Sequence, residues 1–338
     1  MLNPELLTHL VIFCQNLGDA APKMAPFMAH VTALQVIALL NTDDLNLSNE
    51  GMKELVPHLS KLAQLTRLNL FRLIDTASLS ALCDLISSLP RLSALELPAN
   101  EFTPESIEML CEPISKLSNL TQLNLSYSTL DEQSVNALAK ALTHLPLIHL
   151  KLNATFWIAG GFDALVAQFE HWTHLKALSL GYLPTSEEKS SQLATHLSKL
   201  TSLILLDIEI RQPDLMVGLV PMLIPSLKSL PLQALFFSCA QITETSEILL
   251  KEAFPNKRLV KREDYFLIHD TSLPTKQYLE YTSLLLDKKP VVAPIPLIPP
   301  YWAQFRSFKP IKKNQWETYL MQPMLYRHFR YPEQACLL

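Results

Sequence analysis

The chain has 338 residues, of which 49% are hydrophobic and 18% charged, and its formal net charge at pH 7 is −4. This amount of apolar material supports a continuous folded core and excludes an intrinsically disordered chain. No apolar run approaches the roughly 18 residues of a membrane-spanning helix, and the N-terminus lacks the basic and apolar regions of a secretory signal. We therefore expect a cytoplasmic protein with no Sec signal peptide and no transmembrane segment.

A six-residue phrase, Leu-x-x-Leu-x-Leu or a close aliphatic variant, recurs through the first 240 residues. Successive copies begin 27 to 31 residues apart. The alternation within the phrase predicts a short strand that turns every second side chain inward. The copies begin at Leu7, Leu34, Leu65, Leu92, Leu120, Leu147, Leu175, Leu203 and Leu232.

A second apolar pattern follows most copies and has the i, i+3, i+7, i+10 spacing of one helix face. One such set is Ile107, Leu110, Ile114 and Leu117. Strand and helix patterns repeat in register with each other. The sequence therefore predicts one supersecondary unit copied along an axis, in which each copy buries its apolar face against its neighbours.

The pattern resembles the ribonuclease-inhibitor-like class of leucine-rich repeat over residues 2 to 258. The resemblance implies an α/β fold, a right-handed horseshoe with one repeat for each of the nine copies and with helices on its convex side. It also implies protein binding through the concave sheet, without catalysis. Members of the class usually place Asn or Cys three residues after the last Leu of the phrase, where the side chain bonds the loop backbone. Here only Asn100 occupies that position.

The repeat pattern fails near residue 258, which divides the chain into three expected regions. Residues 1–258 form the solenoid. Residues 259–289, with a strand at 264–268 and a helix at 274–287, form a C-terminal cap over the end of the core. Residues 290–338 form a proline-rich strap and tail, because five prolines between positions 290 and 300 favour an extended polyproline conformation.

The tail at residues 301–331 holds nine aromatic and six basic residues against one acid. Its formal charge is +5, which leaves −9 for the rest of a chain whose total is −4. Two interpretations stay open. Either the rings pack back onto the solenoid, or the segment forms an adhesive surface for a partner or an anionic membrane.

Positions 3, 5 and 7 of each strand phrase point away from the core onto the inner face of the sheet, and position 8 lies at its loop edge. Aromatic and arginine side chains anchor many protein interfaces. We therefore predict partner contacts on this face, at this edge and at Trp157. For Trp157 and Phe236, packing within a loop or at the end of the solenoid is the alternative. The predicted contact residues are Arg67, Phe71, Arg72, Glu96, Tyr127, His149, Lys151, Trp157, Tyr182, Asp207, Glu209 and Phe236.

The sequence contains no phosphate-binding glycine loop and no His-Glu-x-x-His motif. Its cysteines form no close pair with metal-ligand spacing, and Cys83 and Cys111, at the same helix position in consecutive units, are interpreted as small hydrophobes. His149 and Lys151 are expected two strands away from Glu96, too far for direct proton transfer. We expect no enzyme activity, no metal, no cofactor and no nucleic-acid partner.

In overall character the chain is similar to type IV-secreted leucine-rich-repeat effectors of intracellular bacterial pathogens, which have irregular repeats and a short C-terminal extension. This resemblance implies a protein translocated into a host cell, where it binds a host protein, with a secretion signal at the extreme C-terminus. We expect a monomer. Glu333, Leu337 and Leu338 also match an acidic dileucine sorting pattern.

The sequence also bears on three alternative functions. The first is an adaptor that docks on a membrane or lipid surface through residues 301–331. GTPase-activating proteins also carry such repeats, but their acidic tail is replaced here by a basic aromatic one. Bacterial ubiquitin ligases need a catalytic domain with a nucleophilic cysteine. The region after residue 258 is too short for that domain, and its only cysteine is Cys336.

Overall fold

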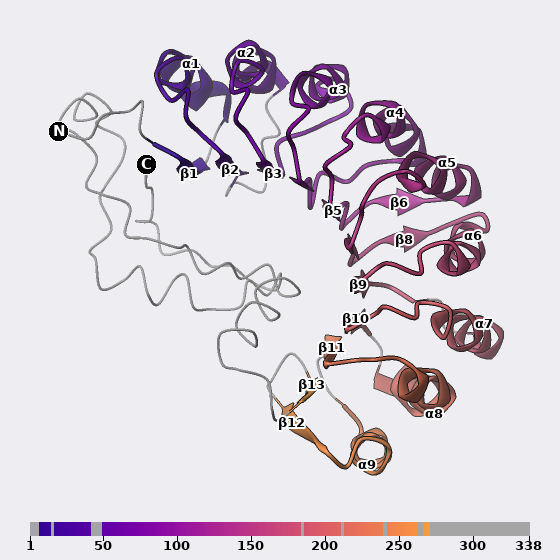
Figure 1. Cartoon of the computed structure of the whole chain (residues 1–338). Helices are drawn as coiled ribbons and strands as arrows, with labels where there is room; N and C mark the ends of the chain where they lie inside the picture. The colour runs from indigo at the N-terminus through magenta and orange to yellow at the C-terminus, as the bar shows by residue number, and fades with distance from the viewer. Residues whose placement is uncertain are drawn as a thin grey trace.

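The computed structural model describes residues 7–14, 17–41, 49–183, 186–210, 213–238, 242–261 and 266–270. The helix expected at 274–287 and the whole region 290–338 lie outside these residues. The described residues form an arc in which strands line the inner side and helices the outer side (Figure 1). Among them, no helix combines the length and the apolar character that a bilayer crossing requires.

One sheet with the strand order β1-β2-β3-β4-β5-β7-β9-β10-β11-β13-β12 runs through the described residues. The strands from β1 to β11 in this order pair in parallel, and each begins two residues after a predicted start. The pairing aligns one leucine of each phrase with the next, as in Leu95, Leu123 and Leu150. These strands are β1 (His9–Cys14), β2 (Val36–Asn41), β3 (Arg67–Phe71), β4 (Ala94–Glu96), β5 (Gln122–Asn124), β7 (His149–Leu152), β9 (Ala177–Leu180), β10 (Leu205–Glu209) and β11 (Ala234–Ser238).

A helix follows each of these strands and lies on the outer side of the sheet (Figure 1). Several helices begin at a residue whose side-chain oxygen accepts a backbone N–H of the first turn, as Thr103 and Asp131 do. The helices are α1 (Leu17–Met28), α2 (Asn49–Leu59), α3 (Leu79–Ser88), α4 (Pro104–Ser115), α5 (Glu132–Leu142), α6 (Gly161–Ala167), α7 (Glu187–Leu197), α8 (Pro213–Ser229) and α9 (Glu244–Ala253). The predicted mixture of a parallel sheet with intervening helices is confirmed.

The strand leucines and the inward helix faces form one continuous core. In one unit, Leu95 of β4 and Ile107, Leu110 and Ile114 of α4 are all fully buried. Burying such a side chain contributes roughly 1.5–3 kcal/mol to stability. Because neighbouring units share this core, each unit depends on the next for its stability.

Asn100 makes the loop contacts that the family resemblance implies for its position. Its Oδ1 accepts hydrogen bonds from the backbone N–H groups of Leu73 and Ile74, both at 2.8 Å. Its Nδ2 donates to the carbonyl oxygen of Leu70, also at 2.8 Å. The side chain therefore joins two successive loops and satisfies backbone groups that would otherwise be buried without partners.

The parallel pairing stops at β11. Strand β13 (Phe266–Asp270) pairs antiparallel with β11, and β12 (Lys257–Lys261) pairs antiparallel with β13 at the edge of the sheet. The strand expected at 264–268 corresponds to β13, whereas β12 was not predicted. Lysines at both ends of an edge strand oppose pairing with another chain, and Lys257 Nζ contacts Asp270 Oδ1 at 2.5 Å.

A second, small parallel ladder joins β6 (Thr129–Leu130) and β8 (Phe156–Trp157). These two strands follow β5 and β7 in the chain and lie in the loops that lead to α5 and α6. The sequence pattern did not predict them. They bring Phe156 and Trp157 next to the loop edge of the main sheet.

Candidate functional site

The parallel strands line the concave side of the arc (Figure 1). Because successive residues of a strand point to opposite faces, the side chains at positions 3, 5 and 7 of each phrase form the inner face. Eight of the predicted contact residues lie on this inner face: Arg67, Phe71, Glu96, His149, Lys151, Asp207, Glu209 and Phe236. Arg72, Tyr127 and Tyr182 lie at the loop edge, and Trp157 lies in β8. Several of these side chains are buried, among them Asp207 and Phe236.

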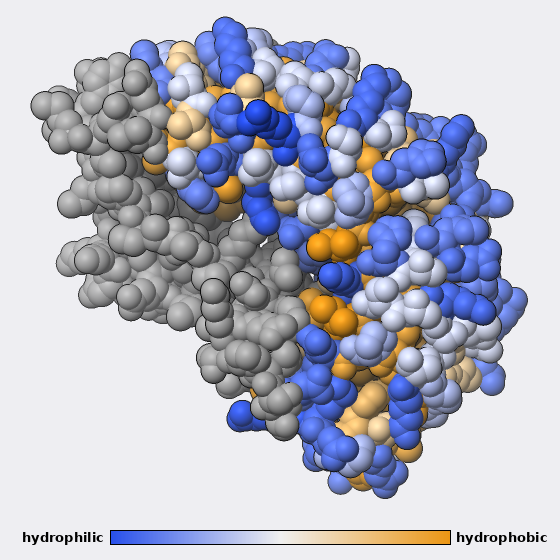
Figure 2. Space-filling model, in the orientation of Figure 1, coloured by the Kyte–Doolittle hydropathy of each residue, from blue (hydrophilic) through white to orange (hydrophobic). Residues whose placement is uncertain are grey.

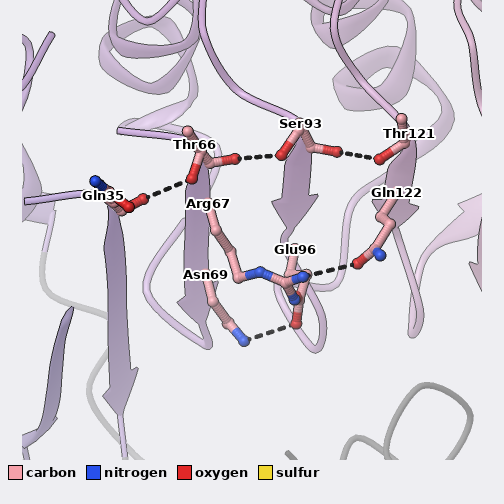
Figure 3. A network of polar contacts seen from close by, with 8 residues as sticks. All are labelled: Gln35, Thr66, Arg67, Asn69, Ser93, Glu96, Thr121 and Gln122. Carbon is pink, nitrogen blue, oxygen red and sulfur yellow. Dashed lines mark hydrogen bonds and ion pairs between the residues drawn. The ribbon is translucent and has the colours of Figure 1, made fainter. Parts of the chain in front are cut away.

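A polar network spans β3, β4 and β5 on the inner face (Figure 3). Arg67 donates from Nη1 to Glu96 Oε1 at 2.8 Å and from Nη2 to Gln122 Oε1 at 3.1 Å. Asn69 Nδ2 donates to the other carboxylate oxygen of Glu96 at 3.0 Å. Both oxygens of the carboxylate thus accept a hydrogen bond, and the arginine and glutamate charges neutralise each other within the network.

Hydroxyl groups link the same strands where each begins (Figure 3). Thr66 Oγ1 donates to the carbonyl oxygen of Gln35 at 3.1 Å, and Ser93 Oγ donates to that of Thr66 at 3.1 Å. Thr121 Oγ1 repeats the contact with Ser93 at 2.9 Å. Because these residues hold the same position in successive phrases, they fix the register on which the Arg67 network depends.

Two acidic side chains of β10 reach across β9. Asn153 Nδ2 donates to Asp207 Oδ2 at 3.0 Å, and the backbone N–H of Ala154 donates to Glu209 Oε2 at 2.8 Å. These side chains can cross β9 because the residues of β9 and its end that lie beneath them are small. At Gly181, an added Cβ would lie 2.0 Å from the Ala154 nitrogen and 2.7 Å from Glu209 Oε2. Both donors are amide groups, one from a side chain and one from the backbone.

His149 lies between the two halves of the inner face. Burial lowers the pKa of its imidazole most, Lys151 and Arg67 also lower it and Glu96 raises it, and together these effects bring the pKa to about 3. The imidazole is therefore neutral at physiological pH. With so low a pKa it is a weak general base, and its ring nitrogens serve as a hydrogen-bond donor and an acceptor.

The loop edge has an unusual backbone. Strands β3, β4, β5, β7 and β9 each lead, at position 8 of the phrase, into a residue that is not glycine yet has a left-handed φ. Holding such a residue there costs on the order of 1 kcal/mol or more. At this position the chain still bonds to the next unit, as Tyr127 N–H donates to the Asn153 carbonyl oxygen at 2.8 Å. The left-handed residues at position 8 are Arg72 (φ 54°), Ala99 (59°), Tyr127 (67°), Ala154 (51°) and Tyr182 (48°).

Two exposed apolar residues adjoin this edge and were missed from the sequence. Phe156 is 54% exposed and Ile158 is 47% exposed, and the Phe156 ring lies 4.8 Å from that of Tyr182. The face seen in Figure 2 likewise shows apolar patches between polar residues of the repeats. No signal in the strand phrase identifies Phe156 and Ile158, because they lie beyond its last position.

Trp157 and Phe236 differ from the other predicted contact residues. The Trp157 ring meets Phe162 edge to face at 5.9 Å, and its Nε1 donates to the Gly181 carbonyl oxygen at 2.9 Å. Phe236 is fully buried in a second apolar cluster with Leu205 and Leu267. These contacts support a packing role for both residues, which is the alternative to partner binding.

The described residues contain no group of three or more His, Cys, Asp or Glu side chains that could hold a metal ion. Burial raises the pKa of the Cys111 thiol to about 12, and burial with Asp84 and Glu112 nearby raises that of Cys83. Both thiols are therefore protonated at neutral pH. Cys111 is buried as expected, whereas Cys83 is only half-buried.

No protein-family model and no curated protein matches the sequence. Similar solved structures include a Bacteroides fragilis protein, with 17% identity, a TM-score of 0.43 and coverage of 68% of this chain and 65% of that protein. The leucine-rich repeat-containing protein LegL7 from Legionella pneumophila is 14% identical over 75% of this chain and 94% of its own, with a TM-score of 0.42. TLR13, in its complex with ssRNA13, is 15% identical over 67% of this chain and 39% of its own, with a TM-score of 0.33.

Proposed function

We propose that this chain is a leucine-rich-repeat horseshoe of nine units that binds a partner protein through its inner face and loop edge. In this proposal residues 1–258 form the solenoid, 259–289 the cap, and 290–338 the strap and tail. The observation that carries the proposal is the left-handed backbone at the loop edge, which presents Arg72, Tyr127 and Tyr182 from three units.

Backbone strain at these positions supports a functional role. Glycine would adopt the left-handed conformation without strain, yet three of the five positions hold an arginine or a tyrosine. Arginine and tyrosine are the residue types that dominate binding energy at protein interfaces. The exposed side chains of Phe156 and Ile158 add apolar surface beside these anchors.

The inner face supports binding better than catalysis. Its polar groups are tied to one another in the Arg67 network and across β9. His149 has a pKa of about 3, well below the range in which a general base works near neutral pH. We therefore assign no enzymatic role to this chain.

As a finer proposal, the partner is a host-cell protein and the chain is a translocated bacterial effector that acts as a monomer. Its support is the sequence character described above: irregular repeats, few glycines and a short C-terminal extension. A translocation assay with a reporter fused before Met1 tests this part. Signal in host cytoplasm that depends on the C-terminal residues is expected, and secretion into the medium without translocation would contradict it.

The binding proposal is tested by affinity capture followed by a titration with the captured protein. Changing Phe71, Arg72, Tyr127 and Tyr182 together to Ala should weaken binding at least a hundredfold, since anchors of this kind each cost about 2 kcal/mol or more. The matched control changes Met109, Val217 and Ile248 to Ala. These residues are exposed large apolar side chains of the outer helices α4, α8 and α9.

The control variant should bind as the unchanged chain does, and both variants should melt within a few degrees of it. Binding that survives the four substitutions at the edge, or that is lost in the outer-helix control, would show that the partner uses another surface.

A further inference from the structure

The loops that lead from each helix to the next parallel strand form a second edge of the arc, which we call the return edge. After α6 this loop follows a short 3-10 helix at Gln168–Glu170. Because the strands are parallel and in register, the loops lie side by side where the strands begin, opposite the loop edge. They comprise residues 29–35, 60–66, 89–93, 116–121, 143–148, 171–176, 198–204 and 230–233.

A chain of backbone hydrogen bonds joins the return loops to one another. Thr66 N–H donates to the Gln35 carbonyl oxygen at 2.8 Å, and Ser93 N–H donates to that of Thr66 at 2.7 Å. The same bond recurs in each later loop, through Thr121, Ile148, Lys176, Ile204 and Gln233. Figure 3 shows the hydroxyl groups that reinforce it between β2 and β5. The return edge is therefore a fixed surface on which successive loops hold equivalent positions.

The return edge carries charge of one sign only. Its eight loops contain five lysine or arginine residues and no aspartate or glutamate. All five cations are exposed, and four exposed histidines in the same loops add no negative charge. The cations are Lys61, Arg91, Lys116, Lys176 and Lys199.

The fold leaves most of this charge without a counter-charge. Lys61, Lys176 and Lys199 take part in no ion pair among the described residues. Arg91 Nη1 donates to a neutral glutamine side chain at 2.5 Å, whereas Lys116 pairs with a carboxylate of α4. The three lysines are therefore available to an external anionic surface.

Stabilisation of helix ends does not explain the whole pattern. A helix C-terminus carries partial negative charge and favours a nearby cation, but this effect falls off within the last turn. Arg91 lies three residues after the end of α3, and Lys176 lies six residues after the 3-10 helix. Because acids are absent from the whole length of each loop, up to the strand, the pattern favours an anionic partner.

We propose that the return edge docks on an anionic phospholipid membrane, with the loop edge facing away from it. Four of the five cations are lysines, whose flexible, hydrated ammonium groups suit a diffuse negative surface, whereas a shaped phosphate site favours arginine. The cations extend over five strand spacings, from the loop before β3 to the loop before β10, or about 24 Å. Charges are screened over about 8 Å at physiological ionic strength, so every cation contributes only where a plane of headgroups lies along the whole edge.

Other anionic partners fit this edge less well. Protein partners and single-stranded nucleic acids are held by apolar or aromatic anchors. Exposed large apolar side chains of the described residues all lie outside these loops, and the aromatic ring within them, Trp172, is buried. A nucleic-acid duplex is also held by backbone N–H groups and helix N-termini. Here one N–H group of each loop bonds the preceding loop, and the helix N-termini lie at the opposite edge.

The docking does not depend on the proposed partner, so its test uses the full-length chain alone. Sedimentation is measured with vesicles of phosphatidylserine and phosphatidylcholine, and with vesicles of phosphatidylcholine alone. We expect binding only to the vesicles that contain phosphatidylserine, and weaker binding as the salt concentration rises, because salt screens the attraction.

A triple variant tests the edge itself. A basic residue near an anionic surface strengthens binding about fivefold. Changing Lys61, Lys176 and Lys199 together to Gln should therefore weaken vesicle binding about a hundredfold.

Two further triple variants are compared with it. The matched control changes Lys23, Lys53 and Lys189 to Gln, which removes the same charge from α1, α2 and the first turn of α7, outside the return edge. It should bind vesicles as the unchanged chain does. The other variant changes Lys309, Lys312 and Lys313 to Gln and reports any contribution of residues 301–331. Thermal melts of the three variants check that each is folded.

Several results would overturn the proposal. They are absence of binding to the phosphatidylserine vesicles, and equal binding by the return-edge variant and the unchanged chain. Binding that is lost only when the three lysines of residues 301–331 are changed would assign the membrane contact to that segment. Binding to duplex DNA that depends on the return edge, without binding to vesicles, would assign the edge to a nucleic acid.

Discussion

The two halves of the inner face handle charge in different ways. In β3 to β5, Arg67 and Glu96 pair with each other and with neighbouring amides, so that charge is satisfied within the sheet. In β9 to β11, Asp207 and Glu209 cross a strand of small residues to reach neutral donors. An acidic side chain on this face can therefore be held by an arginine on the adjacent strand or by amide donors two strands away.

The largest expected effect comes from adding a methyl group at Gly181, directly after β9. Gly181→Ala places a Cβ 2.0 Å from the Ala154 nitrogen, so backbone or the Glu209 carboxylate must move. We expect a loss of about 2–3 kcal/mol in the free energy of unfolding, measured by urea denaturation. Gly218→Ala is the matched control, because nothing lies within 4 Å of its Cβ in α8. It should stabilise by up to about 1 kcal/mol. Equal effects at the two sites would show that β9 is not packed as described.

A second change compares the two halves directly. Glu96→Ala removes the acceptor of two side chains and leaves the Arg67 charge, with only 25% of its side chain exposed, without its carboxylate. We expect a cost of about 2 kcal/mol. Asn153→Ala removes one neutral donor from Asp207 and should cost less, about 1 kcal/mol. A double-mutant cycle of Arg67 with Glu96 should give a clear coupling energy. A coupling energy of zero would show that Arg67 and Glu96 do not interact as described.

The low pKa of His149 makes the stability of the fold depend on pH. His149 has a folded-state pKa of about 3, whereas an unfolded histidine has a pKa of about 6.5. The unfolded chain therefore binds the extra proton first, and stability falls as pH drops from about 6.5 towards 3. Between pH 7 and pH 5 the loss should be about 2 kcal/mol. His149→Gln should remove this part of the slope. An unchanged slope in that variant would mean that the imidazole is protonated in the folded chain.

The smallest effect concerns the backbone of the loop edge. Ala99 has a φ of 59°, so Ala99→Gly should relieve strain and stabilise by about 0.5–1 kcal/mol. The same change in a helix, Ala137→Gly in α5, should cost about 1 kcal/mol. Thermal melts of the two variants should shift in opposite directions. A destabilising Ala99→Gly would contradict the strained edge.

The strands and helices could be predicted because their signals repeat. Leu123 and its equivalents carry the strand alternation, and each strand begins two residues after the predicted start. The strands β6 and β8 could not be predicted, since two residues such as Thr129 and Leu130 show no periodicity. β12 has lysine at both ends and a short apolar centre, which is a weak strand signal.

The site was predicted only in part. Alternation placed Arg67, Glu96 and Asp207 on the inner face, but not their contacts, because these join residues from different units. The need for glycine at position 181 arises from Glu209, which lies on the next strand and reaches over it. The left-handed residues could not be predicted either, since arginine, alanine and tyrosine carry no signal for that backbone.

The central claim is that a partner protein binds the inner face and loop edge, and a hydrogen-exchange footprint of the complex with the captured partner tests it most directly. We predict slower exchange in the loop segments at residues 98–102, 126–130 and 153–158, which follow β4, β5 and β7, and no change in the outer helices α4 to α7. Protection confined to those outer helices, with the loop segments exchanging as in the free chain, would contradict the account.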